Sequence, residues 1–223
     1  SSANAPGTFY SSIWDTKGLD TIRNPSAMDS TIDLRAATLL HAASGGGYLS
    51  AVDGINGGFT IANGVTIEKA VGGSGADTIT GNWAANTLIG NAGNDRINGL
   101  DGADNIIGGR GADTLRGGRG ADNFIYVAAS DSSGQPDVIK DFVHGIDHID
   151  VSAIDANGVG AGNPAFVFRG NSAFTGAGAE VRFVNNAPNN VTNVFFDIDG
   201  NKIADMTIRL TGLITLDAGD FIL

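Results

Sequence analysis

The chain has 223 residues, among them 34 glycines and no cysteine, and its formal net charge is −11. This acidity argues against nucleic acid and anionic membranes as partners, and the lack of cysteine excludes a disulfide scaffold or a cysteine zinc ribbon. No run approaches about 18 apolar residues, so no membrane span is predicted, and no classical signal peptide is visible at the N-terminus. Low aromatic content and many glycines predict a chain that needs a bound ion to fold.

Residues 1–71 are expected to form a β segment that flanks the centre of the chain. Strands are predicted at Phe9–Trp14, Asp29–Leu34 and Gly58–Ile67. The stretch Ala36–Ala43 favours one or two helical turns, and its His41 lacks partners at ligand spacing, which favours a structural role. Asp15 and Asp20 flank a glycine, so an acidic turn is expected there, either an ordinary Asx turn or part of an ion site.

The centre of the chain, from Gly72 to Ile125, consists of six consecutive nonapeptides. The first position of every unit is glycine, the sixth is aspartate or asparagine, and the eighth is apolar. The sixth positions are Asp77, Asn86, Asp95, Asp104, Asp113 and Asp122, and the eighth are Ile79, Leu88, Ile97, Ile106, Leu115 and Phe124. This is the known pattern of the calcium-binding parallel β-helix repeat, whereas a flexible linker would carry no apolar residue in phase.

Each unit is expected to form a six-residue turn and a three-residue strand whose eighth-position side chain points inward. Two units make one coil of a flattened helix, so equivalent residues recur every 18 positions and stack about 4.8 Å apart. One edge then carries Asp77, Asp95 and Asp113, and the other carries Asn86, Asp104 and Asp122. The predicted fold is all-β, a parallel β-roll over residues 72–125 that continues into a β-sandwich-like part over residues 126–223.

Stacked carboxylates at this spacing repel one another by roughly 1–4 kcal/mol per pair, so a cation is expected between them. Calcium suits the site because it accepts carboxylate and carbonyl oxygens in flexible geometry. Zinc would call for Cys or His, which the repeats lack, and magnesium resists dehydration. The second unit, GNWAANTLI, has Asn86 in place of aspartate and lacks the middle glycine, so it is expected to bind calcium weakly or as a shared neighbour.

The last part of the chain reads as further strands separated by turns. They are predicted at Phe124–Ala128, Phe166–Arg169, Ala179–Val184, Val191–Ile198, Met206–Thr211 and Asp220–Leu223. The segment Asp137–Ser152 alternates around a turn at His144 and Gly145. His144 and His148 have the spacing of a helical zinc pair, but the intervening turn and the missing glutamate favour two surface histidines.

A second group of ligand-type residues lies near the C-terminus. Asp197, Asp199, Asn201 and Asp205 resemble the start of an EF-hand loop that lacks the bidentate glutamate, which favours a plain β-turn over a calcium site. The sequence contains no G-x-S-x-G and no H-E-x-x-H motif, so no catalytic site is predicted in this chain.

Several of these motifs together resemble a known family. The repeats, followed by D-x-I-x-D-F-x-x-G-x-D-x-I-D from Asp137 to Asp150, resemble the RTX modules of type I-secreted bacterial proteins. Residues 13–21 are similar to the I-W-D-x-G-G-x-D-T motif of the C-terminal domain of serralysin-type zinc metalloproteases, and the G-V-T-I-E at 64–68 is similar to that family's lead into the first repeat. The ending at 220–223 resembles the acid-plus-three-apolar terminus that the type I exporter reads.

The resemblance implies a set of calcium ligands. Before the repeats they are Asp15, Lys17, Gly18, Asp20, Thr66 and Glu68, although Lys17 stands where the family has glycine. Within the repeats, the sixth-position side chains are joined by backbone groups of Gly73, Gly75, Asn82, Ala84, Gly90, Asn91, Ala92, Gly93, Gly99, Leu100, Asp101, Gly102, Gly108, Gly109, Arg110, Gly111, Gly118 and Gly120. After the repeats, Asp131, Asp137 and Asp147 match positions that close the last sites.

The function expected from this resemblance is a secreted, calcium-dependent module for export and folding. It would pass through a type I exporter, fold outside the cell and stabilise an upstream zinc metalloprotease domain, with no zinc bound in this chain. Two alternatives are a stand-alone RTX surface or adhesin protein and the R-module of a polysaccharide-modifying enzyme such as a mannuronan epimerase. The motifs at 13–21 and 64–68 favour the protease lineage.

Overall fold

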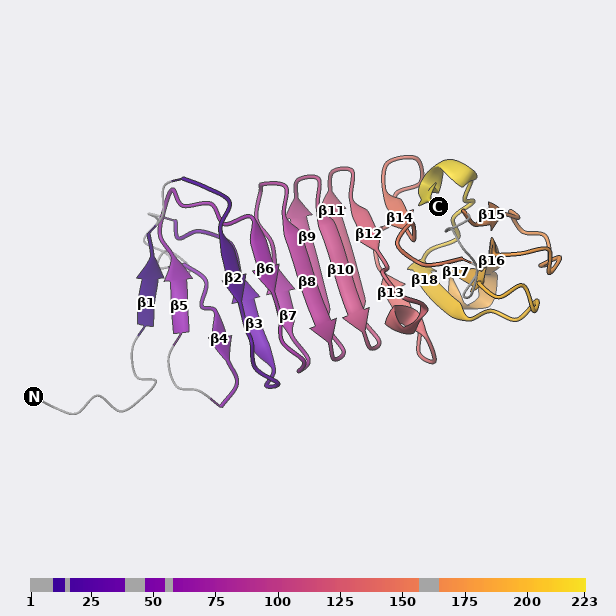
Figure 1. Cartoon of the computed structure of the whole chain (residues 1–223). Coiled ribbons are helices and arrows are strands. Elements are labelled where there is room, and N and C mark those ends of the chain that lie inside the picture. Colours follow the sequence, from indigo (N-terminus) through magenta and orange to yellow (C-terminus); the bar gives the residue numbers. More distant parts are fainter. Residues whose placement is uncertain (1–9, 15–16, 39–46, 55–57, 157–164) are drawn as a thin grey trace, which may run out of the picture.

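The computed structural model describes residues 10–14, 17–38, 47–54, 58–156 and 165–223, and strands dominate it (Figure 1). The seven-stranded sheet has the order β19 (Phe221–Ile222), β14 (His148–Asp150), β12 (Asn123–Ile125), β10 (Asn105–Arg110), β8 (Thr87–Ala92), β6 (Lys69–Val71), β2 (Thr21–Arg23). The ten-stranded sheet has the order β15 (Val167–Phe168), β16 (Glu180–Asn186), β17 (Val191–Asp197), β18 (Met206–Thr211), β13 (Asp137–Ile139), β11 (Thr114–Arg119), β9 (Arg96–Asp101), β7 (Thr78–Thr80), β3 (Ser30–Asp33), β4 (Ala51–Val52). A separate pair joins β1 (Tyr10–Ile13) to β5 (Gly58–Ile61).

The repeats form the parallel β-roll that the sequence predicts. Successive units alternate between the two large sheets, so β8 pairs in parallel with β10, and Leu88 lies opposite Ile106. In the other sheet β9 pairs in parallel with β11, and Ile97 lies opposite Leu115. Both pairs of residues are 18 positions apart, which confirms the two-unit coil, and Figure 1 shows the coils stacked along the molecule.

The predicted division of each unit into a long turn and a three-residue strand is wrong for the central coils. Strands β8, β9, β10 and β11 each contain six residues, because pairing continues through the second and third positions of the next unit. Asn91 and Ala92, for example, lie opposite Gly109 and Arg110. Pairing omits the glycine at the first position and resumes at the second, where φ is positive, so the turn proper is confined to the fourth to sixth positions.

The eighth-position side chains form the core of the roll. They are almost fully buried, from 0% exposed for Leu88 to 2% for Ile97. Each sheet extends this column beyond the repeats, since Ile32 lies opposite Ile79 and Phe124 lies opposite Ile149, which in turn lies opposite Phe221. Both sheets therefore run continuously across residues 72 and 125, which mark the limits of the sequence repeat.

The flanking parts differ from the sequence expectations in several ways. Of the stretch predicted to be helical, residues 36–38 are not helical, and Ala36 forms an isolated bridge with Ile61; residues 39–43, including His41, lie outside the described residues. The strand predicted at Gly58–Ile67 ends at Ile61, because a turn follows in which the Val65 N–H donates to Ala62 at 3.2 Å. The structure also contains three short 3₁₀ helices, η1 (Ala129–Ser132), η2 (Ala187–Asn189) and η3 (Ala218–Asp220). The strand predicted at 124–128 ends at Ile125, and the one predicted at 220–223 is reduced to Phe221–Ile222 because η3 includes Asp220.

The C-terminal part adds antiparallel strands to the roll. Strands β16, β17 and β18 form an antiparallel meander, and β18 then pairs in parallel with β13 of the roll. Phe166, Phe168, Phe183, Phe196 and Phe221 pack together between this meander and the end of the seven-stranded sheet, with Phe166 and Phe196 in edge-to-face contact at 5.6 Å between ring centroids. Among the described helices, none has the length and apolar character needed to cross a membrane.

Candidate metal centre

The sixth-position side chains form two ladders of hydrogen bonds along the edges of the roll. In the first, Asp95 Oδ1 accepts the backbone N–H of Asp77 at 2.7 Å, and Asp113 Oδ1 accepts the N–H of Asp95 at 2.7 Å. The second ladder repeats this arrangement at 2.7 and 2.9 Å between Asn86, Asp104 and Asp122. One oxygen of each aspartate therefore ties its coil to the preceding coil.

The other oxygen, Oδ2, is buried without a hydrogen-bond partner in five of the aspartates that build these ladders. They are Asp95, Asp104, Asp113, Asp122 and Asp137. Burial raises the pKa of Asp95 and of Asp104 to about 7 and that of Asp137 to about 8, and neighbouring carboxylates add to each shift. An unpartnered buried acceptor costs about 1–3 kcal/mol and more when it is charged, so these rows of oxygens favour either a proton or a bound cation.

The first-position glycines leave the space that these oxygens face. A Cβ on Gly90 would overlap Asp95 Oδ2 and would come within 2.5 Å of the Gly108 carbonyl oxygen in the next coil. A Cβ on Gly99 would meet the Asp104 carboxylate and the Gly117 carbonyl in the same way. The unpartnered oxygens of Asp95 and Asp104 thus border a space that a carbonyl of the neighbouring coil also borders, and calcium accepts oxygen ligands of both kinds.

The backbone groups predicted as ligands come together in columns. The fourth-position glycines stack with positive φ, +117° at Gly93 and +144° at Gly111, and a Cβ on Gly111 would overlap the Gly93 carbonyl. At the second position, Asn91 and Leu100 also have positive φ, +80° and +82°, where a side chain is seldom found. Some of the predicted carbonyls already accept hydrogen bonds, as Arg110 O does from the Gly93 N–H at 2.9 Å.

The degenerate second unit has different chemistry at this edge. Asn86 Oδ1 accepts the N–H of Asn82 at 2.8 Å, as an aspartate would, but its amide nitrogen faces the carbonyls of Ile67 and Glu68 at 3.3 Å. The Asn82 amide donates to the same Ile67 carbonyl at 2.7 Å. Both amides are therefore satisfied without an ion in this structure, and the weak calcium binding expected of the unit stays a prediction.

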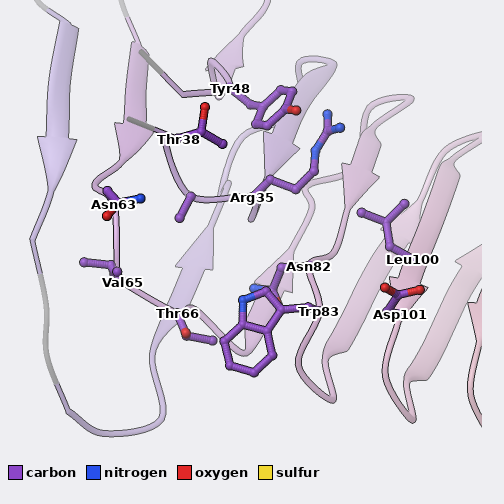
Figure 2. Close-up of a pocket in the computed structure, with 12 residues that line it drawn as sticks. Arg35, Thr38, Tyr48, Asn63, Val65, Thr66, Asn82, Trp83, Leu100 and Asp101 are labelled. Atoms are coloured by element: carbon purple, nitrogen blue, oxygen red, sulfur yellow. The ribbon is translucent and has the colours of Figure 1, made fainter. Parts of the chain in front are cut away.

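The structure brings together only part of the ligand set predicted before the repeats. The Glu68 side chain accepts the Asp20 N–H at 3.0 Å, whereas Lys17 and Gly18 are exposed, and Asp15 lies outside the described residues. Thr66 lines an open cavity of about 440 Å³ together with Arg35, Tyr48, Asn82, Trp83, Leu100 and Asp101 (Figure 2). A shared role of Thr66 and Glu68 in binding calcium stays a prediction.

The residues predicted to close the last sites continue the two ladders. Asp137 Oδ1 accepts the Asp113 N–H at 2.8 Å, and Asp147 Oδ1 accepts the Asp122 N–H at 3.1 Å. Asp131 instead accepts the N–H groups of Val127 and Ala128 at 2.9 and 3.0 Å at the start of η1.

One ladder member, Ser30, and one further carboxylate that binds the backbone of the roll, Asp141, were not found from the sequence. Ser30 begins the first ladder, since its N–H and its hydroxyl both donate to Asp77 Oδ1, at 2.7 and 2.6 Å. Asp141 accepts the Gly117 N–H at 3.1 Å. Ser30 lies outside the nine-residue phase and carries no sequence signal for this role, whereas Asp141 belongs to the D-x-I-x-D-F motif and was detectable there.

The remaining ligand-type residues take up local hydrogen bonds. His144 Nδ1 lies 2.8 Å from the buried Asp220 carboxylate, which raises the pKa of the imidazole, while His148 lies on β14. Asp197 accepts the N–H groups of Gly200, Asn201 and Lys202 at 2.9–3.1 Å in a tight turn. Ligand atoms of Asp197, Asp199 and Asp205 lie within 4.8 Å of one another. This geometry fits both the plain β-turn and the calcium site that the sequence suggests.

Comparisons with known proteins agree with this architecture. Serralysin C from Dickeya chrysanthemi is 48% identical over 177 residues, which cover 79% of this chain and 33% of that protein. Metalloprotease AprA from Pseudomonas entomophila is 40% identical over 222 residues, covering 94% and 41% respectively. Among solved structures, the AlgE6R2 subunit of the Azotobacter vinelandii mannuronan C5-epimerase superposes with a TM-score of 0.52 at 26% identity, covering 69% of this chain and 91% of that chain.

A sequence model of one family covers the whole chain. It is described as peptidase M10 serralysin C terminal and matches residues 1–223. The chain spans less than half of the length of the relatives named above, 33% of one and 41% of the other. By this match and by its similarity to these relatives, the chain belongs to the serralysin C-terminal family of M10 peptidases.

Proposed function

We propose that this chain is a calcium-dependent folding and export module at the C-terminal end of a secreted metalloprotease. The observation that carries the proposal is the row of buried, unpartnered carboxylate oxygens at Asp95, Asp104, Asp113, Asp122 and Asp137. Calcium held by these oxygens and by neighbouring carbonyls would neutralise the repulsion along each edge and join adjacent coils. The free energy of calcium binding would then be part of the free energy of folding.

The proposed location and partners follow from the family. In a low-calcium cytoplasm the acidic coils would repel one another, which keeps the chain unfolded and suited to threading through a type I exporter. Outside the cell, calcium would fold the roll, and the folded module would stabilise the catalytic domain that precedes it. Similarity over 79–94% of the chain to Serralysin C and Metalloprotease AprA supports a protease module over a stand-alone adhesin. The identity to the epimerase subunit is lower, 26%, which makes an R-module the weaker alternative.

A calcium titration tests the proposal. The chain, purified without calcium, is followed by far-ultraviolet circular dichroism while free calcium is raised, with magnesium as the matched ion. The β signal is expected to appear cooperatively with calcium and not with equal magnesium. A chain that is fully folded at neutral pH in excess chelator would show that the proposed coupling is wrong.

The export role needs a separate experiment. The parent protein is expressed with its exporter, either intact or without residues 220–223, and the culture medium and cells are assayed for it. The truncated protein is expected to stay inside the cells. Equal amounts of both proteins in the medium would contradict the role of this terminus, and an upstream sequence without H-E-x-x-H would contradict the protease assignment.

A further inference from the structure

The outer face of the ten-stranded sheet carries a row of cations, one for each of four neighbouring strands. They are Arg96 on β9, Arg116 on β11, Lys140 directly after β13, and Arg209 on β18. All four side chains are exposed, because the residues next to them on each strand point into the core. We name these four residues the basic row.

The register of the strands gives the basic row its geometry. Arg96 lies opposite Thr114, Thr114 opposite Val138, and Val138 opposite Arg209, so these four residues form one line across the sheet. Arg116 and Lys140 lie two residues further along their strands. Neighbouring strands are about 4.8 Å apart, so the four cations span roughly 14 Å at one positive charge per strand.

These charges are not used within the described part of the chain. None of the four cations forms an ion pair with a carboxylate there, and Arg209 makes a hydrogen bond to the neutral Asn193 at 3.5 Å. The charge of Arg116 acts on Asp141, whose pKa is raised by burial and lowered in part by this cation. The other exposed or half-buried residues of these strands are Asn98, Leu100, Asp101, Thr114, Gly118, Arg119, Val138, Thr207 and Thr211. The exposed Asp101 lies opposite Arg119, beyond the basic row.

The opposite sheet provides an internal contrast. Its outward positions on β8, β10 and β12 hold mainly neutral residues, namely Thr87, Ile89, Asn105, Ile107, Asn123 and Ile125. The basic residues of this sheet are Arg110 at the end of β10, Lys69 on β6 and Arg23 on β2, so they do not fall on four neighbouring strands. A chain with a net charge of −11 therefore places four of its 13 basic residues together on one flat face. Like charges on neighbouring strands repel one another, so grouping four cations on one face costs stability. A surface that contacts only solvent does not require this grouping.

We propose that the basic row binds an acidic polysaccharide, specifically a linear polyuronate lying across the strands. Such a polymer carries one carboxylate on every sugar, so it can meet a cation at each strand, and arginine binds carboxylates with paired N–H donors. The intervening threonine and asparagine side chains can hydrogen-bond the sugar hydroxyls. The outward positions of β9, β11, β13 and β18 carry no aromatic side chain on which a nucleic-acid base could stack, and their apolar residues Leu100 and Val138 are half-buried, which leaves a membrane little apolar surface to contact.

The proposal is tested with the calcium-folded chain and a short oligogalacturonate by isothermal titration calorimetry. Free calcium is kept fixed, because uronates also bind this ion. A maltooligosaccharide of the same length is the neutral control glycan. The test variant is Arg116→Gln/Lys140→Gln, and the matched control is Arg23→Gln/Lys69→Gln, which removes the same charge from the outer face of the seven-stranded sheet.

The oligouronate is expected to bind, with an affinity that falls as sodium chloride is added. The Kd should rise roughly 2- to 30-fold in the test variant, the range for losing two surface ion pairs, and less than 2-fold in the control. Circular dichroism at the same calcium concentration establishes that each variant is folded, and Arg96→Gln/Arg209→Gln replaces the test variant if that variant is unfolded.

Several results would overturn the proposal. They are no binding of the oligouronate, equal affinity of the test and control variants, equal affinity for the neutral glycan, or tighter binding of single-stranded DNA or anionic phospholipid vesicles at the same row. Each of these is distinguishable from a failure of the calcium proposal, which appears in circular dichroism with chelator before any glycan is added.

Discussion

Removing calcium is expected to make the stability of this fold fall steeply as the pH rises. Without the ion, burial raises the pKa of Asp95 and Asp104 to about 7, of Asp113 to about 6 and of Asp137 to about 8, from the ordinary aspartate value of 3.8. The folded chain then holds protons that the unfolded chain has already released. The contribution of these groups to stability is complete below pH 4 and is lost as the pH rises through 6 to 8.

The size of the effect follows from the number of protons. Each proton held only by the folded state contributes about 1.4 kcal/mol per pH unit to the slope, so four groups give at most about 5 kcal/mol per pH unit. Partial access of solvent to the edges of the roll reduces this, and we expect about 2–3 kcal/mol per pH unit. A domain is stable by only about 5–15 kcal/mol, so two pH units decide whether the calcium-free chain is folded.

The measurement is urea unfolding in calcium-depleted buffer, followed by circular dichroism from about pH 5 to about pH 8, and repeated with saturating calcium. Without calcium, the urea midpoint should fall across this range. With calcium it should hold or rise, because the metal requires deprotonated carboxylates. A calcium-free midpoint that stays constant or rises would refute the reasoning that burial without partners governs these aspartates.

Three substitutions test separate parts of the structure. Asp104→Asn keeps the acceptor for the Asn86 N–H but replaces the unpartnered oxygen, so calorimetry should detect one calcium fewer per chain. The control variant Asp53→Asn changes an exposed residue and should bind the full number of calcium ions. Equal numbers of bound calcium ions in both variants would contradict the assignment. Gly90→Ala places a Cβ against the Asp95 carboxylate and should cost about 1–3 kcal/mol in urea unfolding, whereas an unchanged midpoint would mean that the coil can widen. Phe196→Ala removes a ring that is 0% exposed and should cost about 3–5 kcal/mol, and a loss below 1 kcal/mol would mean that the meander is not closely packed.

The roll was predictable because its sequence is periodic. The phase of the eighth-position side chains fixes which residues point inward, and the 18-residue register follows from it, as the pairing of Leu88 with Ile106 confirms. The length of the strands was not predictable, because glycine at the first position is typical of a turn, whereas here pairing resumes beyond it and continues through Ala92 and Arg110.

The ends of the ladders show a second limit of sequence reasoning. Asp137 and Asp147 follow their predecessors by 24 and 25 residues, so they are out of phase with the repeat and were identified only through the family motif. Ser30 could not be found at all, because it lies 47 residues before Asp77 and a serine hydroxyl is a common donor with no spacing of its own. The antiparallel meander of β16, β17 and β18 was found as strands, but its pairing with β13 depends on contacts distant in sequence.

Strand β19 pairs with β14 and places Phe221 opposite Ile149, so residues 221–222 join a sheet whose other strands come much earlier in the sequence. The ribosome makes β19 after every other strand of this sheet, so the sheet lacks one strand until synthesis has passed residue 222. A nascent chain cannot complete the sheet before that point. A chain that entered a new compartment tail-first would instead deliver the closing strand ahead of the coils that stack on it.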